Sequence, residues 1–268
     1  MDRLRVNSFG RSAAHDLAVK ERLYEAEDLE VEHAATQSSK AQMRELVDGV
    51  WDVVNTNADN VFWWNEDNGA DLVIVEATPG TAGQDFVVRP EITRYEDLRG
   101  KPLAVDAAES GYATALRVLL REAGLVQEGR DFTFLEVGAT QQRIDALRDG
   151  RAFGAMIGSS QAASLPAEGL HILDSINRLY THYAGCTAVR RRWAEEHGEP
   201  LVRYLRATIR SRSRAAEPDG PGAPPPFDWE GLREMMQMRR DLGMLRGPAD
   251  PHRFGDESYY ARALETLA

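Results

Sequence analysis

The sequence contains one cysteine, Cys186, among its 268 residues. A single cysteine excludes an internal disulfide framework and any zinc site built from several cysteines. No apolar run reaches the roughly 18 residues that a membrane-spanning helix needs, so we expect no membrane insertion. The first residues do not form a basic segment followed by an apolar one, which is the pattern of a secretory signal. If Met1 is the natural start, we therefore expect a cytoplasmic protein.

Basic side chains are also scarce. The 32 lysines and arginines face 43 aspartates and glutamates, for a formal net charge of −11. Binding to nucleic acid needs a basic face, so we expect no nucleic-acid partner. The Gly-x-Gly-x-x-Gly, Gly-Lys-Ser/Thr and Gly-x-Ser-x-Gly motifs are missing as well. No spacing of histidines and carboxylates predicts a metal site. We expect chemistry without a metal or another cofactor.

Strand-like and helix-like segments alternate through the first two-thirds of the sequence. Strands are expected at Leu4–Ser8, Leu29–Ala34, Trp51–Asn55, Leu72–Ala77, Phe86–Val88, Leu103–Asp106, Phe132–Val137 and Phe153–Ile157. Helices are expected at Ala13–Glu27, Ser38–Asp48, Gly111–Glu122, Thr140–Asp149, Trp229–Leu242 and Asp256–Leu267. Short strands that alternate with helices predict an α/β fold with largely parallel sheets. After Tyr180 the pattern becomes helical.

A weak internal repeat has a period of about 100 residues. LRVNSFGRSAAHDLAVKERLYEA, from Leu4, aligns with LAVDAAESGYATALRVLLREA, from Leu103. ELVDGVWDVVNTNADN, from Glu45, aligns with ALRDGRAFGAMIGSSQAA, from Ala146. Any two strand–helix–strand units share some of this pattern, but here the Asp-Gly helix stops also coincide. The repeat predicts two similar α/β lobes that face each other across a cleft.

Ligands of open parallel sheets bind where strands end and helices begin. Four such corners carry polar or small residues. Candidate ligand-binding residues are Asn7, Ser8, Arg11, Ser12, Asn57, Asn60, Trp63, Asp106, Ser110, Gly111, Tyr112, Ser159 and Ser160. Free N–H groups at helix starts favour a carboxylate or sulfonate, and aromatic rings would cover an apolar ligand body. Helix capping explains Ser12 and Ser110 equally well, and core packing explains Trp63.

Several stretches resemble a known family. They are YEDLRGKPLAVDAAESGYATALRVLLREAGL, DFTFLEVGATQQRIDALRDGRAFGAMI, VDGVWDVVNTNADNVFWW and DESYYARALETL. Together they resemble the type II periplasmic binding proteins of the nitrate/taurine/alkanesulfonate group, which includes pyrimidine-precursor-synthase-like proteins. The resemblance covers nearly the whole chain. It is specific for the fold and weak for the ligand, because the shared motifs are mostly structural.

The resemblance implies a Venus-flytrap architecture, in which a ligand is clamped in a cleft between two lobes. It implies that residues 1–90 and 179–268 form the first lobe, and that residues 91–178 form the second. The chain would cross between the lobes near Val88–Ile92 and again near Ser175–Tyr180. The carboxyl-terminal helices would then return to the first lobe.

The transporter members of this group carry a signal peptide or lipid anchor, and this sequence shows neither. Relatives with the same fold in the cytoplasm include cofactor-free enzymes: aromatic-acid decarboxylases, a sulfinate desulfinase and dehydratases of menaquinone precursors. The pyrimidine-precursor synthases need a cysteine-rich motif, which the lone Cys186 does not supply. The desulfinase type has a cysteine in its first lobe, where this sequence has serine and arginine.

Three residues are catalytic candidates. His15 lies about one turn into the first predicted helix, where a cleft-facing imidazole would act as general acid or base near neutral pH. His182 precedes Cys186 by four residues and would activate its thiolate. A buried, inert thiol explains Cys186 as well. The contexts of His33, His171, His197 and His252 suggest nothing catalytic.

Two functions remain open. We favour a cytoplasmic, cofactor-free enzyme of the lyase, decarboxylase, dehydratase or hydrolase type that acts on a small anionic molecule. His15 would transfer the proton, and closure of the lobes would exclude water. The alternative is a solute-binding receptor of an ABC transporter of the nitrate/taurine/sulfonate type, whose partner would be the transporter permease.

Overall fold

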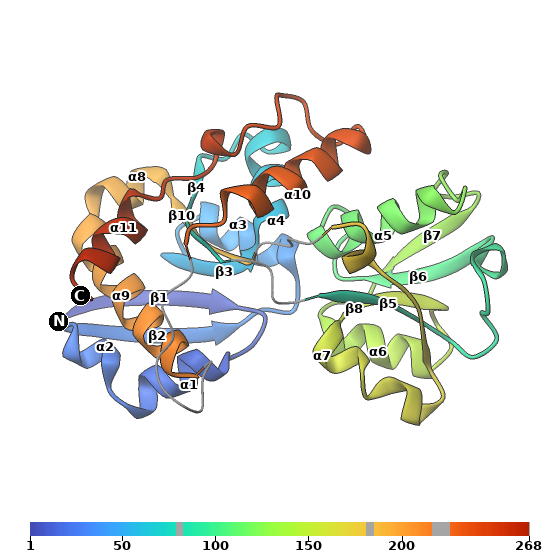
Figure 1. Cartoon of the computed structure of the whole chain (residues 1–268), viewed down its shortest axis with the longest axis horizontal. Coiled ribbons are helices and arrows are strands. Elements are labelled where there is room, and N and C mark those ends of the chain that lie inside the picture. The colour runs from blue at the N-terminus through green and yellow to red at the C-terminus, as the bar shows by residue number, and fades with distance from the viewer. Residues whose placement is uncertain (79–82, 181–184, 216–225, 268) are drawn as a thin grey trace.

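The computed structural model describes residues 1–78, 83–180, 185–215 and 226–267 (Figure 1). The strands are β1 Asp2–Ser8, β2 Leu29–Ala35, β3 Val53–Asn57, β4 Leu72–Thr78, β5 Gln84–Val88, β6 Lys101–Val105, β7 Phe132–Glu136, β8 Gly154–Gly158, β9 His171–Ser175 and β10 Gly185–Arg190. The α-helices are α1 Ala13–Lys20, α2 Leu23–Ala26, α3 Ser39–Val47, α4 Ala58–Asp67, α5 Gly111–Glu122, α6 Thr140–Arg148, α7 Ser159–Ala162, α8 Arg191–Glu196, α9 Gly198–Ala215, α10 Trp229–Asp241 and α11 Ser258–Glu265. Short 3-10 turns are η1 Tyr95–Leu98, η2 Leu165–Glu168, η3 Ile176–Arg178 and η4 Pro251–Arg253.

The strands form two separate five-stranded sheets, at the left and the right of Figure 1. The first has the order β2-β1-β3-β10-β4, and the second has the order β7-β6-β8-β5-β9. In each sheet the first three strands are parallel, and the fourth runs antiparallel to both of its neighbours. The predicted two-lobed α/β architecture is thus confirmed.

The internal repeat is visible in the strand order, because β1, β2 and β3 occupy the places that β6, β7 and β8 occupy in the second sheet. Both predicted Asp-Gly stops end a helix, α3 before Gly49 and α6 before Gly150. Each glycine has a positive φ, +79° and +75°, which an L side chain rarely adopts. The two repeat units therefore end their second helix in the same way.

The first crossing between the sheets differs from the prediction. β5 pairs with β8 and β9, so it completes the second sheet. The chain therefore leaves the first sheet after Thr78 and enters the second at Gln84, and the crossing predicted at Val88–Ile92 is wrong. Backbone pairing places β5 in the second sheet, although it lies within residues 1–90. The lobe boundaries at 90/91 and 178/179 stay a prediction.

Two strands near the second crossing were also missing from the sequence prediction. β9 lies at the edge of the second sheet, and β10 inserts between β3 and β4 of the first. Ala188 and Val189 of β10 are fully buried there. The expectation that only helices follow Tyr180 is therefore wrong at this strand.

Helix α4 lies beside the first sheet, and its residues 58–64 are all buried. It packs against β4, α3, α5 and α10. The ring of Phe62 lies 5.4 Å from that of Phe254, and the rings of Trp63 and Trp64 meet edge to face at 5.6 Å. Trp63 is 7% exposed and belongs to this core.

The arginines of α9 fasten this helix to the first lobe. Arg206 and Arg210 bind the two carboxylate oxygens of buried Glu27, at 2.8 and 2.9 Å. Arg212 binds Glu76 at 2.7 Å.

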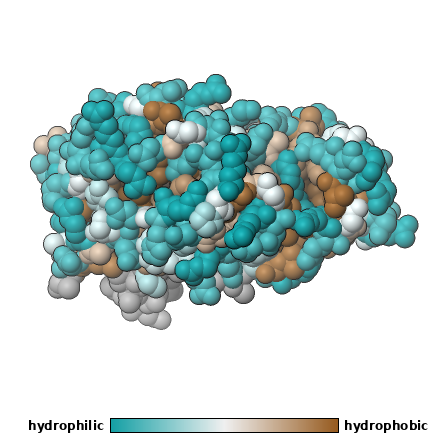
Figure 2. All heavy atoms as spheres, turned by 90° about the horizontal axis from the view of Figure 1, so that it is seen from above, coloured by the Kyte–Doolittle hydropathy of each residue, from teal (hydrophilic) through white to brown (hydrophobic). Residues whose placement is uncertain are grey.

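Within the described residues, no helix has the length and apolarity to cross a membrane. The face of the molecule in Figure 2 is mainly hydrophilic.

A buried ion pair joins three helices between the two sheets. Oδ2 of Asp59 on α4 accepts hydrogen bonds from Nη1 of Arg239 on α10, at 2.8 Å, and from Oγ1 of Thr114 on α5, at 2.9 Å. The Asp59 and Arg239 side chains are 2% and 1% exposed. Removing one partner would leave the other charge buried without compensation.

We therefore expect Asp59→Ala to lower the free energy of unfolding by about 3–5 kcal/mol, as for other broken buried pairs. The matched control is Glu199→Ala, because Glu199 forms an exposed pair with Arg262 at 3.0 Å. The control should change stability by less than about 1 kcal/mol. Urea unfolding measures both, and equal effects would contradict the structural role of the buried pair.

Candidate functional site

A cavity of about 640 Å³ lies between the ends of the two sheets. Its walls come from both lobes, as the alignment of strand ends and helix starts predicted. Predicted site residues that line it are Ser8, Ser12, His15, Asn57, Asn60, Asp106, Ser110, Gly111, Tyr112 and Cys186. Lining residues that sequence reasoning missed include Tyr24, His33, Ser39, Glu76, Gln84, Thr140, Arg143, Thr187, Tyr204 and Arg212.

Other predicted residues lie elsewhere. Asn7 is buried beneath the cavity, where its Oδ1 accepts a hydrogen bond from Nε2 of Gln42 at 3.0 Å. Arg11 is exposed outside the lining, Trp63 packs in the core, and the α7 residues Ser159 and Ser160 are not part of the wall. These five residues are not among those that line the cavity, and their assignment as ligand contacts stays a prediction. His182 lies outside the described residues.

One end of the cavity is built around Arg143 of α6, whose side chain is 4% exposed. Its Nη2 donates to Oγ1 of Thr140 at 2.9 Å, and its guanidinium lies 4.5 Å from the centre of the Tyr112 ring. Its Nη1 lies 4.0 Å from Oδ1 of Asp106, which is too long for a direct hydrogen bond. We call Ser39, Asp106 and Arg143 the arginine end.

Asp106 also bridges the lobes. Its Oδ2 accepts hydrogen bonds from the backbone N of Ser39, at 3.1 Å, and from Oγ of Ser39, at 2.6 Å. Ser39 begins α3, so the carboxylate lies at the positive end of this helix. The start of α3, where Ser38 is the cap, is therefore already occupied by an anionic group of the protein.

Further hydrogen bonds hold the lobes together beside Asp106. Oδ1 of Asn60, on α4, accepts from the backbone N of Gly111 at 3.3 Å. Nε2 of Gln142 donates to Oε1 of Gln37 at 2.6 Å. Asn60 and Gly111 were predicted to contact the ligand, and the structure uses them in contacts between the lobes.

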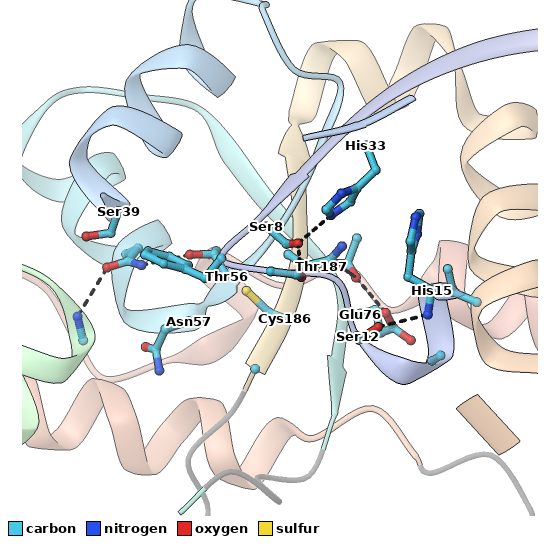
Figure 3. Close-up of a pocket in the computed structure, with 18 of the residues that line it drawn as sticks. Ser8, Ser12, His15, His33, Ser39, Thr56, Asn57, Glu76, Cys186 and Thr187 are labelled. Carbon is cyan, nitrogen blue, oxygen red and sulfur yellow. Dashed lines mark hydrogen bonds between the residues drawn. The ribbon is translucent and has the colours of Figure 1, made fainter. Parts of the chain in front are cut away.

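The opposite end of the cavity carries two histidines, and Figure 3 shows His15 and His33 across the pocket from Ser39. Their ring centres are 4.5 Å apart. Nε2 of His33 lies 2.7 Å from Oγ of Ser8, and Nδ1 of His15 lies 3.2 Å from Oη of Tyr24. We call Ser8, His15, Tyr24 and His33 the histidine end.

Both imidazoles are held in the neutral form. Burial, together with the positive charges of His15 and Arg11, lowers the pKa of His33 to about 4. Burial and Arg11 also lower the pKa of His15, and Asp16 opposes this only in part. His15, the predicted proton-transfer residue, is therefore a neutral group in the cavity at neutral pH.

A polar network forms the floor between the two ends. Glu76 of β4 accepts hydrogen bonds from Oγ1 of Thr187 and Nη1 of Arg212, both at 2.7 Å. Nδ2 of Asn55 donates to Oη of Tyr204 at 3.3 Å, and burial raises the pKa of Tyr204 to about 12. The negative charge of Glu76 is thus balanced by Arg212 within the protein.

Cys186 lines this floor on β10 and is 6% exposed. Burial, together with the nearby carboxylate of Glu76, raises the pKa of its thiol well above the usual range. A protonated thiol is a poor nucleophile. Of the two alternatives open for Cys186, the structure favours the buried, inert thiol.

The fold and the cavity together define a class of protein. Two similar α/β lobes, joined by two crossings and enclosing a polar cavity, form the architecture of a type II periplasmic binding protein. Residues 17–219, which are more than half of the chain, match the family described as "ABC transporter, phosphonate, periplasmic substrate-binding protein". The chain belongs to this phosphonate-binding periplasmic family.

Solved structures agree on the fold. A protein from Bordetella bronchiseptica RB50 is similar with a TM-score of 0.80 and 17% identity, covering 100% of this chain and 98% of that one. The alkanesulfonate-binding protein SsuA from Xanthomonas axonopodis pv. citri, bound to MOPS, has a TM-score of 0.69 and 18% identity, with 98% and 84% covered. The desulfurization enzyme DSZB has a TM-score of 0.66 and 14% identity, with 100% of both chains covered. No curated protein matches the chain.

The burial of Cys186 generates a direct prediction. Because thiol reagents attack the accessible thiolate, we expect the native protein to react at least about 100-fold more slowly than the urea-unfolded protein. Ellman's reagent measures this at a pH of about 8. The single cysteine makes the unfolded chain its own control. Equal rates in the two states would show that the thiol is accessible and reactive.

Proposed function

We propose that this protein is the solute-binding receptor of an ABC transporter, and that it holds a small anionic organic molecule between its lobes. The observation that carries the proposal is the buried guanidinium of Arg143 in the wall of the interlobe cavity. Membership of the periplasmic substrate-binding family supports the same role. A ligand carboxylate, sulfonate or phosphonate would accept charge-assisted hydrogen bonds from this side chain.

The charge pattern of the arginine end supports an anion in particular. Asp106 uses one carboxylate oxygen to hold Ser39, and its other oxygen stays 4.0 Å from Nη1 of Arg143. Nη2 of the guanidinium donates to Oγ1 of Thr140 at 2.9 Å, and the side chain is 4% exposed. A ligand oxyanion that enters between the lobes would therefore meet a desolvated cation, where an electrostatic contact is stronger than in water.

The size of the cavity supports a compound of ordinary metabolite size. Its volume of about 640 Å³ lies within the usual range of small-molecule sites. The family description names phosphonate, and the structural neighbour SsuA is an alkanesulfonate-binding protein. Both groups are compact oxyanions, and we propose a ligand of this kind attached to a polar organic body.

The partner and the location follow from the receptor role. A receptor of this class delivers its ligand to a membrane permease, which we propose as the protein partner. The family is described as periplasmic, and this favours a periplasmic location over the cytoplasmic one that sequence analysis expected. The comparisons also support the receptor better than the cytoplasmic lyase.

A second candidate function is catalysis in the same cavity. It is favoured by the 2.7 Å contact between Oγ of Ser8 and Nε2 of His33, because a neutral imidazole accepts the hydroxyl proton once the hydroxyl turns from the carbonyl oxygen of Gly10, to which it donates at 2.6 Å. The ligand extracted from the purified protein, identified by mass spectrometry, separates the two functions. If the protein is a receptor, an added sample of that compound stays unchanged. If it is an enzyme, it converts the compound, and the Ser8→Ala variant does not.

We expect Arg143→Gln to weaken binding of a small anion by about 10- to 100-fold, because a charged hydrogen bond contributes about 1.5–3 kcal/mol. The control is Arg148→Gln, on the same helix, where Arg148 forms exposed pairs with Asp145 and Glu168. Titration calorimetry with ethanesulfonate, methylphosphonate and propionate measures the affinities. If Arg143→Gln binds as tightly as Arg148→Gln, or if none of the three anions binds, the anionic-ligand proposal is overturned.

A further inference from the structure

The cavity has two ends with different electrostatics. The arginine end carries a guanidinium that keeps its charge at every physiological pH. The histidine end, at the right of Figure 3 and opposite Ser39, carries two imidazoles that change charge with pH. A ligand acid would therefore interact with the two ends in different ways.

The surroundings of the histidine end are electropositive. Ala13 and Ala14, in the first turn of α1, line the cavity beside the histidines, at the positive end of the helix. The charge of Arg11 acts on both His15 and His33. Asp16 is the acidic group on α1 that opposes it, and this residue is exposed.

The other elements packed around the pair add no net charge. Tyr24 of α2 contacts His15 through its hydroxyl and stacks on Tyr204 of α9 at 6.0 Å. Behind these rings, Arg212 and Glu76 form an ion pair and cancel each other. Ser8 of β1 contributes a neutral hydroxyl. The described residues thus provide no strong anion for the histidine pair.

We propose that the histidine end is an acid-binding subsite of the ligand cavity, and that an anionic group of the ligand enters it together with one proton, which His15 and His33 share. The proposal rests on the receptor function proposed above and names a chemical property of the ligand. The ring centres are 4.5 Å apart, so two positive charges would repel strongly, and one proton serves the pair.

The sign of the pH dependence follows from linkage. In the empty cavity the pKa of His33 is about 4, so the pair is neutral at neutral pH. An oxyanion beside the rings favours the charged imidazolium and raises this pKa. If it returns to the ordinary value of about 6.5, binding takes up a proton below that pH, and affinity rises as pH falls.

The test uses butane-1,4-disulfonate as the probe, because it carries one anionic group for the arginine end and a second for the histidine end, and both sulfonates stay ionised throughout the range. Titration calorimetry between about pH 7.5 and pH 5.5 should show an affinity increase of about tenfold for the unaltered protein. Repeating the titration at the lower pH in two buffers of different ionisation enthalpy should give an uptake that approaches one proton per bound anion.

His33→Gln should remove most of this increase, because the glutamine amide does not titrate but still reaches a hydrogen-bonding partner. His15→Gln should reduce it. His171→Gln, on β9 and outside the cavity wall, is the control and should keep the full tenfold change. Thermal unfolding of the four proteins without the anion shows whether each variant is folded.

The outcomes separate this inference from the receptor proposal. Affinity that does not vary with pH, or a pH dependence that survives in both cavity variants, overturns the inference while anion binding itself stands. If ethanesulfonate, methylphosphonate and propionate all fail to bind at every pH, the anionic-receptor proposal fails and the subsite fails with it.

Discussion

The carboxylate of Asp106 sets the geometry on which the cavity depends. One of its oxygens holds the start of α3 in the first lobe, through the backbone and hydroxyl of Ser39. The other oxygen faces Arg143 in the second lobe, at 4.0 Å. Because a buried carboxylate needs hydrogen bonds to offset its desolvation, this contact favours an arrangement in which the lobes meet. One carboxylate thus joins the start of α3 to the part of the cavity wall that carries Arg143.

The internal repeat shows how the two lobes differ at equivalent places. Asn7 and Gln42 of the first repeat occupy the places that Asp106 and Arg143 occupy in the second. In the first lobe the two amides bind each other at 3.0 Å and are sealed beneath the cavity. In the second lobe the same places hold opposite charges that reach the cavity wall. The two amides of the first lobe are in hydrogen-bond contact, whereas the two charged groups of the second lobe stay 4.0 Å apart at the cavity wall.

Much of the fold could be predicted from the sequence, since alternating strands and helices, Ser12, Ser38 and Ser110 as caps, and the Asp-Gly stops all act locally. β5 and β10 could not be placed, because their neighbours in the sheet are distant in sequence. The cavity was located from strand ends, and Asp106 and His15 were among the predicted residues, but Arg143 and His33 were missed. Arg143 lies in a helix whose polar sequence predicts an exposed position. The signal in the sequence for its burial is its alignment with Gln42 in the repeat. The sequence gives no sign of a role for His33. The register of β2 with β1 pairs it with Val6, and its ring reaches Oγ of Ser8, two residues further along β1, at 2.7 Å.

Two arginines anchor β10 and β5, the strands that follow the crossings between the sheets. Arg190, at the end of β10, binds the carbonyl oxygens of Leu46 and Trp51 around the end of α3. Arg89, directly after β5, binds the carbonyl oxygen of Leu147 near the end of α6, at 2.8 Å. These arginines stabilise equivalent helix ends, although one follows the second crossing and the other the first. Each crossing therefore leads into a strand whose far end is anchored to a helix of the same sheet's lobe.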